Sequence, residues 1–168
     1  MSVNVSVSGD DVNVQVGPLY YFGSFYSTAD QLSAGANQVN KMTYNATDIS
    51  NGVSIVSNSR ITIANAGVYN IQFSAQLDKT DSGDDVVDIW LSKNNNNVVN
   101  SNTQTTLTGN AGKHVAAWNF FVQTAAGDYY EICWSSPDSA VFLNYVAAQS
   151  TPTRPAIPSV ILTVNKVG

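Results

Sequence analysis

Charge is scarce in this sequence, and the basic residues are scattered. Only 11% of the 168 residues are charged, and seven Lys and Arg against twelve Asp and Glu give a net charge of −5. A nucleic-acid-binding surface needs Lys or Arg to neutralise phosphates, so we expect no DNA or RNA partner. The sequence also lacks eighteen consecutive apolar residues, and we therefore expect no membrane-spanning segment.

Residues that serve nucleophilic or metal chemistry are almost missing as well. The single cysteine, Cys133, cannot form a disulfide within the chain, and we expect it to be a small buried apolar residue. The single histidine, His114, opens an apolar strand, where surface hydrogen bonding is its expected role. Neither a Gly-Xaa-Ser-Xaa-Gly elbow nor a Gly-rich phosphate loop is present. We therefore expect no enzymatic activity and no cofactor.

Neutral polar residues take the place of the missing charges. Asn (19), Ser (19) and Thr (13) make up 51 of the 168 residues. A surface made mainly of these residues forms hydrogen bonds without carrying charge, which is typical of permanent, repetitive assemblies. The first residues, MSVNVSVSGDD, lack the basic and apolar regions of a secretory signal, so we do not expect export by that route.

The most informative stretch of the chain is 61–77, ITIANAGVYNIQFSAQL. Its second half alternates apolar and polar residues, which predicts an antiparallel strand with one buried face. Gly67 lies in the turn before that strand, where a positive φ is expected. The alternation assigns four large residues of this strand to the core: Tyr69, Ile71, Phe73 and Leu77.

Short alternating runs of this kind recur along the whole chain. They predict roughly ten to twelve strands and no long helix, hence an all-β antiparallel sandwich. The run 115–124 is apolar at both parities, so we expect it to be covered on both faces. Three prolines in 149–158 predict a loop that crosses between sheets, as a jelly roll requires. The three tryptophans are expected in the core: Trp90, Trp118 and Trp134.

Residues 1–17 are predicted to form a hairpin that precedes the main domain, 18–168. Two valine-alternating runs flank a Gly/Asp turn, which is the pattern of a β-hairpin. A lone hairpin is only marginally stable, so its valine face must pack on something. Two interpretations are open: an extra hairpin on the sheet of the parent domain, or an arm that docks on another protein. The residues of the arm that would dock are Val3, Val5, Val7, Val12, Val14 and Val16.

The acidic loop 78–88 is the best candidate for a metal site. Carboxylate oxygens suit Ca²⁺, and the candidate ligands are Asp81, Asp84 and Asp85. Their spacing does not match an EF-hand loop, which places acids at alternate positions with a later Glu. We therefore expect a solvated acidic loop without a bound metal.

Several motifs, in chain order, resemble the C1q/TNF-like jelly roll. The stretch 61–77 resembles the signature strand of that family. IWLSKN at 89–94 is similar to a strand that ends in a Lys-Asn turn, and AGDYY at 126–130 resembles the family's Gly-Asp element. VIL at 160–162 is placed like the closing strand, and the aromatic run LYYFGSFY at 19–26 like the opening strand. Each of these motifs is short. Together, in this order, they imply a jelly-roll fold.

The same resemblance implies a homotrimer packed around a threefold axis through an aromatic-rich face. The expected interface residues are Tyr20, Phe22, Phe25, Trp118, Phe120 and Tyr145. The chain departs from secreted animal members because it has neither a collagen-like Gly-X-Y stalk nor a secretory signal. Its composition and leading hairpin look more like the C1q/TNF-like modules of tailed-phage particles.

This analogy predicts a virion structural protein that is assembled in the host cytoplasm. The expected function is that of a trimeric capsid decoration (cement) protein, whose partners are itself and the major capsid protein or another virion protein. The alternative is a receptor- or glycan-binding tip of a phage fibre. In that case the recognition loops would be 94–97, 101–106 and 149–156. A fold does not by itself give a function, so this step remains an expectation.

Overall fold

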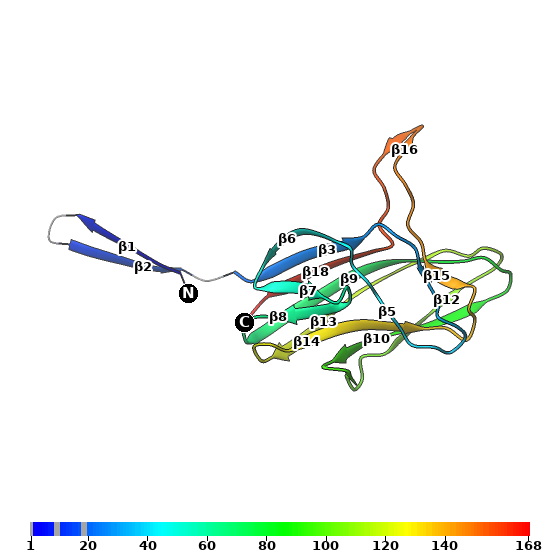
Figure 1. Cartoon of the computed structure of the whole chain (residues 1–168), viewed down its shortest axis with the longest axis horizontal. Coiled ribbons are helices and arrows are strands. Elements are labelled where there is room, and N and C mark those ends of the chain that lie inside the picture. The colour runs from blue at the N-terminus through cyan, green and yellow to red at the C-terminus, as the bar shows by residue number, and fades with distance from the viewer. Residues whose placement is uncertain (1, 9–10, 18–19) are drawn as a thin grey trace.

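The structure is a computed structural model that describes residues 2–8, 11–17 and 20–168. All regular secondary structure in these residues is β-strand. Two seven-stranded antiparallel sheets pack face to face, and two further ribbons have two strands each (Figure 1). The predicted all-β antiparallel sandwich is confirmed. No helix with the length and apolar character needed to cross a membrane occurs in the described ranges.

The first sheet, called the β9 sheet, is built on the longest strand. Its strands are β3 (Phe22–Ser27), β4 (Gln31–Leu32), β6 (Ala46–Asn51), β9 (Gly67–Lys79), β13 (His114–Thr124), β15 (Val141–Leu143) and β18 (Val160–Lys166). On one edge β9 pairs with β18, and on the other it pairs with β13 along eleven residues. Strand β13 is therefore an edge strand of this sheet.

The second sheet, called the β14 sheet, covers the inner face of the first. Its strands are β5 (Asn40–Lys41), β7 (Val53–Val56), β8 (Arg60–Ile63), β10 (Asp85–Lys93), β11 (Asn96–Asn97), β12 (Thr103–Leu107) and β14 (Tyr129–Ser135). The chain passes from β8 in this sheet to β9 in the other, then back to β10 and β12, and again to β13. These crossings between sheets make the sandwich a jelly roll.

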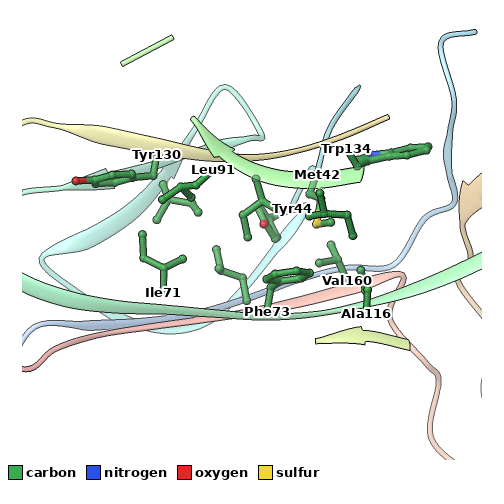
Figure 2. Close-up of a cluster of buried hydrophobic side chains, with 14 of the residues drawn as sticks. Met42, Tyr44, Ile71, Phe73, Leu91, Ala116, Tyr130, Trp134 and Val160 are labelled. Atoms are coloured by element: carbon green, nitrogen blue, oxygen red, sulfur yellow. The ribbon is translucent and has the colours of Figure 1, made fainter. Parts of the chain in front are cut away.

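The core lies between the two sheets and is filled by alternate residues of each strand. On β9, Tyr69 and Ile71 are 0% exposed, Phe73 is 2% exposed and Leu77 is 1% exposed. Figure 2 shows Ile71 and Phe73 facing side chains from the opposite sheet, among them Tyr130. Burial of each large apolar side chain stabilises the fold by about 1.5–3 kcal/mol.

Gly67 begins β9 in a conformation that favours glycine, with φ of 153°. A Cβ at this position would lie 2.5 Å from the carbonyl oxygen of Gly168. That oxygen accepts a hydrogen bond of 2.8 Å from the backbone N–H of Val68. The absence of a side chain thus lets the segment after β18 pack against the start of β9.

The Pro-rich loop 149–158 differs from its prediction. It does not cross between sheets, because β15 before it and β18 after it both belong to the β9 sheet. Within 149–158 the chain forms a ribbon of β16 (Gln149–Ser150) and β17 (Thr153–Arg154) that projects from the sandwich (Figure 1). Two-residue strands fit between the prolines, which sequence patterning alone does not resolve.

The N-terminal hairpin consists of β1 (Ser2–Ser8) and β2 (Asp11–Gly17), which pair only with each other. Its register places valine opposite valine, as in the pairs Val3–Val16 and Val7–Val12. Val5, the one valine of the hairpin whose exposure is described, is 59% exposed. The centre of the predicted turn, 9–10, lies outside the described residues. Within the described residues, the hairpin is hydrogen-bonded to neither large sheet.

Candidate self-association and ligand-binding surfaces

The outer face of the β9 sheet is made of side chains in regular rows across four strands. Since residues paired across antiparallel strands share a face, the register of β13, β9, β18 and β3 defines these rows. The first row is Ala117, Ser74, Ile161 and Tyr26. The second is Asn119, Gln72, Thr163 and Ser24. The third is Phe121, Asn70, Asn165 and Phe22. None of these residues carries a charge.

Hydrogen bonds within the rows leave this face polar but neutral. Asn119 donates from its side-chain amide to Asn70 at 2.9 Å, and the Thr163 hydroxyl donates to Gln72 at 3.5 Å. Large apolar side chains are exposed beside them. Their exposed fractions are 64% for Phe121, 53% for Val115, 40% for Ile161 and 56% for Ile49. The rows themselves are uncharged, and Asp48 lies at their border beside Tyr26 and Ile161. Neutral rows with exposed apolar groups suit contact with another protein surface.

The predicted interface residues are distributed over different environments. Tyr20 is 69% exposed, whereas Phe22 and Tyr145 are half-buried. Phe25 is 1% exposed and lies in the core, so its assignment to an interface is wrong. Aromatic residues occur at both parities of the run 19–26, and the sequence does not say which parity faces inward.

Trp118 and Phe120 point into the sandwich rather than out of its face. The Trp118 ring packs edge-on against Phe73 with ring centroids 4.8 Å apart, and Phe120 stacks on Phe73 at 6.2 Å. Both remain half-buried because β13 is an edge strand and the two sheets are not hydrogen-bonded to each other there. The Trp118 indole nitrogen is buried without an acceptor among the described residues. This open edge adjoins the outer face along β13.

Sequence reasoning missed Val115, Phe121 and Ile161 as exposed apolar residues. The run 115–124 was expected to be covered on both faces, but Val115, Ala117 and Phe121 are exposed in the protomer. Once β13 is paired with β9, the buried partner Phe73 fixes which parity faces inward. That register depends on residues 37 to 57 positions apart in the chain, so no local signal could supply it.

The outer face of the β14 sheet differs because it carries an ion pair among its strands, whereas at the β9 sheet the pair Lys113–Asp78 lies beyond the end of the rows. Lys41 lies 2.7 Å from Glu131, whose side chain is only 1% exposed and accepts a hydrogen bond of 2.7 Å from Ser59. At the end of the sandwich, Lys93 is paired across the strands with the core residue Tyr130, and its ammonium lies 2.7 Å from Asp128. The hydrogen bond from Lys93, with others from Asn94 and the Ala125 backbone, holds the pKa of Asp128 well below its ordinary value of 3.8. Both carboxylates are thus engaged in structural contacts.

The acidic loop forms a cluster, but with different members from those predicted. Carboxylate oxygens of Asp81, Asp85 and Asp138 lie within 4.8 Å of one another. Asp84 is not part of this cluster, because its side chain accepts a hydrogen bond from the Gly109 backbone. The buried ammonium of Lys79 lies 2.8 Å from Asp85 and 3.9 Å from Asp81, so a cation of the chain itself neutralises part of the charge.

Cys133 and His114 lie on strands of different sheets. Cys133 is 3% exposed, and burial raises the pKa of its thiol to about 11. A thiol with so high a pKa is a poor nucleophile near neutral pH. His114 is exposed at the start of β13, opposite Leu77 of β9.

One recess of about 380 Å³ lies between the sandwich and the base of the projecting ribbon. Its wall includes Lys113, which pairs with Asp78, and Arg154, whose Nε donates to Gln149 at 2.5 Å. The Nη1 nitrogen of Arg154 is buried without an acceptor among the described residues. Because Asp78 also lines the recess and pairs with Lys113, the net positive charge of this recess comes from Arg154.

A second recess, of about 390 Å³, lies on the outer face of the β14 sheet. It is lined by Asp88 and Trp90 of β10 and by residues of the following turn. Trp90 alternates with the buried Ile89 and Leu91 and does not pack against the core. Its assignment to the core is therefore wrong, whereas Trp134 is fully buried at 0% exposure.

Comparison with known proteins identifies the architecture. No family model matches the chain, and no curated protein matches it. The globular domain of zebrafish complement 1qA protein is similar in structure, with a TM-score of 0.53 over 88% of this chain and 98% of that one. The sandwich is a C1q/TNF-like jelly roll. At 10% sequence identity this likeness shows the fold alone.

Proposed function

We propose that the protein is a non-enzymatic structural protein that assembles as a homotrimer through the outer face of the β9 sheet. One observation carries the proposal. The three rows on this face are made of uncharged residues, and Phe121 and Ile161 are exposed there in the protomer. Contact with a second copy removes these apolar groups from water without the cost of burying a charge.

The arrangement of β13 supports a closed ring of copies. This strand carries Phe121 on the outer face and Trp118 at the open edge of the sandwich. These are two different surfaces, so the face of one copy can meet the edge of the next in a head-to-tail contact. Head-to-tail contacts that close produce cyclic oligomers, and the fold resemblance favours three copies.

The role within an assembly is that of a capsid decoration (cement) protein in a virus particle. The neutral polar composition suits a permanent, repetitive lattice. The hairpin β1–β2 supports an attachment arm, because it is hydrogen-bonded to neither sheet of the sandwich. Its partner would be the major capsid protein or another virion protein, and its location the virion. A trimer attached in this way adds contact area between neighbouring capsid subunits.

Light scattering coupled to size-exclusion chromatography tests the trimer directly. The whole chain should elute with three times the mass of 17.9 kDa at micromolar concentration. A monomer under these conditions would overturn the proposed assembly.

Deletion of residues 1–17 tests the attachment arm. The truncated chain should remain a folded trimer and no longer join the particle. A sharper variant replaces Val12, Val14 and Val16 by Thr, which keeps strand propensity but removes apolar surface. The matched control replaces Asn13 and Gln15 by Thr on the same strand. Equal loss of attachment in the variant and the control would contradict a specific role for the valines.

A further inference from the structure

The recess beside Trp90 has the chemistry of a ligand site. It is lined by Asp88, Trp90, Asn97, Val98, Asn100, Asn102 and Ser135. Its volume of about 390 Å³ falls in the range of small-molecule sites, about 300–1,000 Å³. It combines one aromatic ring with several polar side chains that converge from β10, β14 and the segment between β11 and β12.

Trp90 is held in place by the recess itself. Its indole N–H donates a hydrogen bond of 2.8 Å to the side-chain oxygen of Asn97. The ring is half-buried and is not part of the apolar core. With its polar atom satisfied, it offers a fixed apolar surface on which a ring with C–H groups can pack.

The carboxylate of Asp88 is also fixed in position. Its Oδ1 accepts hydrogen bonds from Asn102 at 2.9 Å and from Gln104 at 3.4 Å. Its Oδ2 has no hydrogen-bond partner within the part of the chain that the structure describes. That oxygen can accept a hydrogen bond from a ligand hydroxyl without any rearrangement of the side chain.

The remaining polar groups match a hydroxyl-rich ligand. An Asn side chain both donates and accepts, as a hydroxyl does, and Asn97, Asn100 and Asn102 all line the recess. No Lys, Arg or His lines it, and Asp88 contributes a negative charge. The recess therefore disfavours phosphorylated, sulfated or sialylated ligands. The basic recess at Arg154 has the opposite character.

We propose that the recess beside Trp90 binds a neutral sugar, with the ring stacked on Trp90 and its hydroxyls on Asp88 and the Asn side chains. This inference goes beyond the proposed structural role and depends on neither the trimer nor the virion. Two of the recognition loops expected from the sequence, 94–97 and 101–106, contribute residues to this recess. The third, 149–156, lies at the other recess.

Titration of the whole protein with neutral sugars, followed by ¹H–¹⁵N NMR, tests the proposal. The probes are glucose, galactose, mannose and N-acetylglucosamine, together with neutral oligosaccharides on a glycan array. The indole N–H signals of the three tryptophans are assigned by single Trp→Phe substitutions. At least one neutral sugar should shift the Trp90 signal in a saturable way, while the signal of the buried Trp134 stays unchanged.

Variants separate this site from other binding. Trp90→Ala should weaken binding by about tenfold or more, and Asp88→Asn several-fold. Trp90→Phe keeps an aromatic surface and should retain part of the affinity. The matched controls are Val99→Ala, which changes a residue that is 83% exposed outside the recess, and Arg154→Gln in the basic recess. Neither control should alter binding.

Three results would overturn the proposal. One is the absence of any Trp90 shift or array signal with neutral sugars. Another is full affinity in Trp90→Ala. The third is binding restricted to acidic glycans and lost in Arg154→Gln, which would move the site to the base of the ribbon.

Discussion

The two outer faces of the sandwich differ in where they carry charge, although one core supports both. The outer face of the β9 sheet presents rows of neutral residues with Phe121 and Ile161 exposed. The outer face of the β14 sheet carries the ion pair Lys41–Glu131 and the carboxylate of Asp88. Since burying a charge costs more than burying an amide, the first face is suited to contact with protein and the second to water.

This contrast also separates the two proposals. Self-association uses the neutral face and the open edge at β13, whereas the sugar recess lies on the charged face, beside Trp90. A trimer formed through the β9 sheet leaves the β14 sheet facing outward. Assembly and recognition would then occupy opposite sides of the same domain.

The largest expected effect comes from placing a charge on the neutral face. Ala117→Glu introduces a carboxylate beside Ser74 in the first row, where a trimer would bury it without a partner. We expect a loss of about 3–5 kcal/mol in assembly, enough to give monomers at micromolar concentration. Light scattering measures the mass, and circular dichroism checks that the fold is kept.

The matched control for that charge is Thr106→Glu on the opposite face. Thr106 is exposed on β12 and pairs with Val86 of β10. The control should remain a trimer. If both variants stay trimeric, the neutral face is not the interface.

The next largest effect is expected from Lys41→Ala on the charged face. It leaves the carboxylate of Glu131, which is 1% exposed, with only the hydroxyl of Ser59. We expect a loss of about 2–3 kcal/mol in the free energy of unfolding, less than for a fully buried pair because Lys41 is 42% exposed. Urea denaturation at fixed protein concentration measures this. Adding Glu131→Gln should recover most of the loss, and no recovery would argue against the ion pair as its cause.

A smaller effect with a pH signature is expected from Asp128→Asn. Because the pKa of Asp128 is depressed in the folded state, its contribution is present above the unfolded value of 3.8 and is lost as pH falls from there towards the folded pKa. Solvent screening limits the effect to about 1 kcal/mol at neutral pH. Thermal unfolding of the unmodified protein and of Asp128→Asn should show their difference in stability shrinking as pH falls into the acid range. A difference independent of pH would contradict this account.

The smallest effect is expected within the neutral face itself. Asn119→Ser removes the hydrogen bond of 2.9 Å to Asn70 on an exposed surface. We expect the free energy of unfolding of the protomer to fall by about 0.5 kcal/mol or less, because water replaces the lost partner. Comparing Asn119→Ser in trimeric and dissociated protein shows whether the contact matters only on assembly. A loss comparable to that of Lys41→Ala would contradict the difference between the faces.

The sequence predicted the fold where one parity of a strand is apolar and the other polar. Strand β9 is such a case, and its residues Tyr69, Ile71 and Phe73 are buried. On β10 the same alternation placed Trp90 opposite to Ile89, so the sequence held the signal that Trp90 faces outward. The hydrophobicity of tryptophan outweighed that signal and led to the wrong assignment.

The candidate surfaces were less predictable because they depend on pairing between distant segments. Both parities of 115–124 are apolar, and only the register with β9 decides that Phe121 faces outward. In the same way, Asp138 reaches Asp81 and Asp85 through the fold and not through spacing in the sequence. Local patterns give the strands, whereas the surfaces arise from the register between them.

The projecting ribbon offers a site for engineering. At its base Val146 and Ile157 exchange backbone hydrogen bonds of 3.0 and 2.8 Å, which close the loop before it leaves the sandwich. Residues at its tip, such as Thr151 and Pro152, are exposed. Loop tips that are closed at the base tolerate insertions well, so a foreign peptide placed between β16 and β17 should be displayed without disturbing the jelly roll. Each proposed trimer would then display three copies of that peptide.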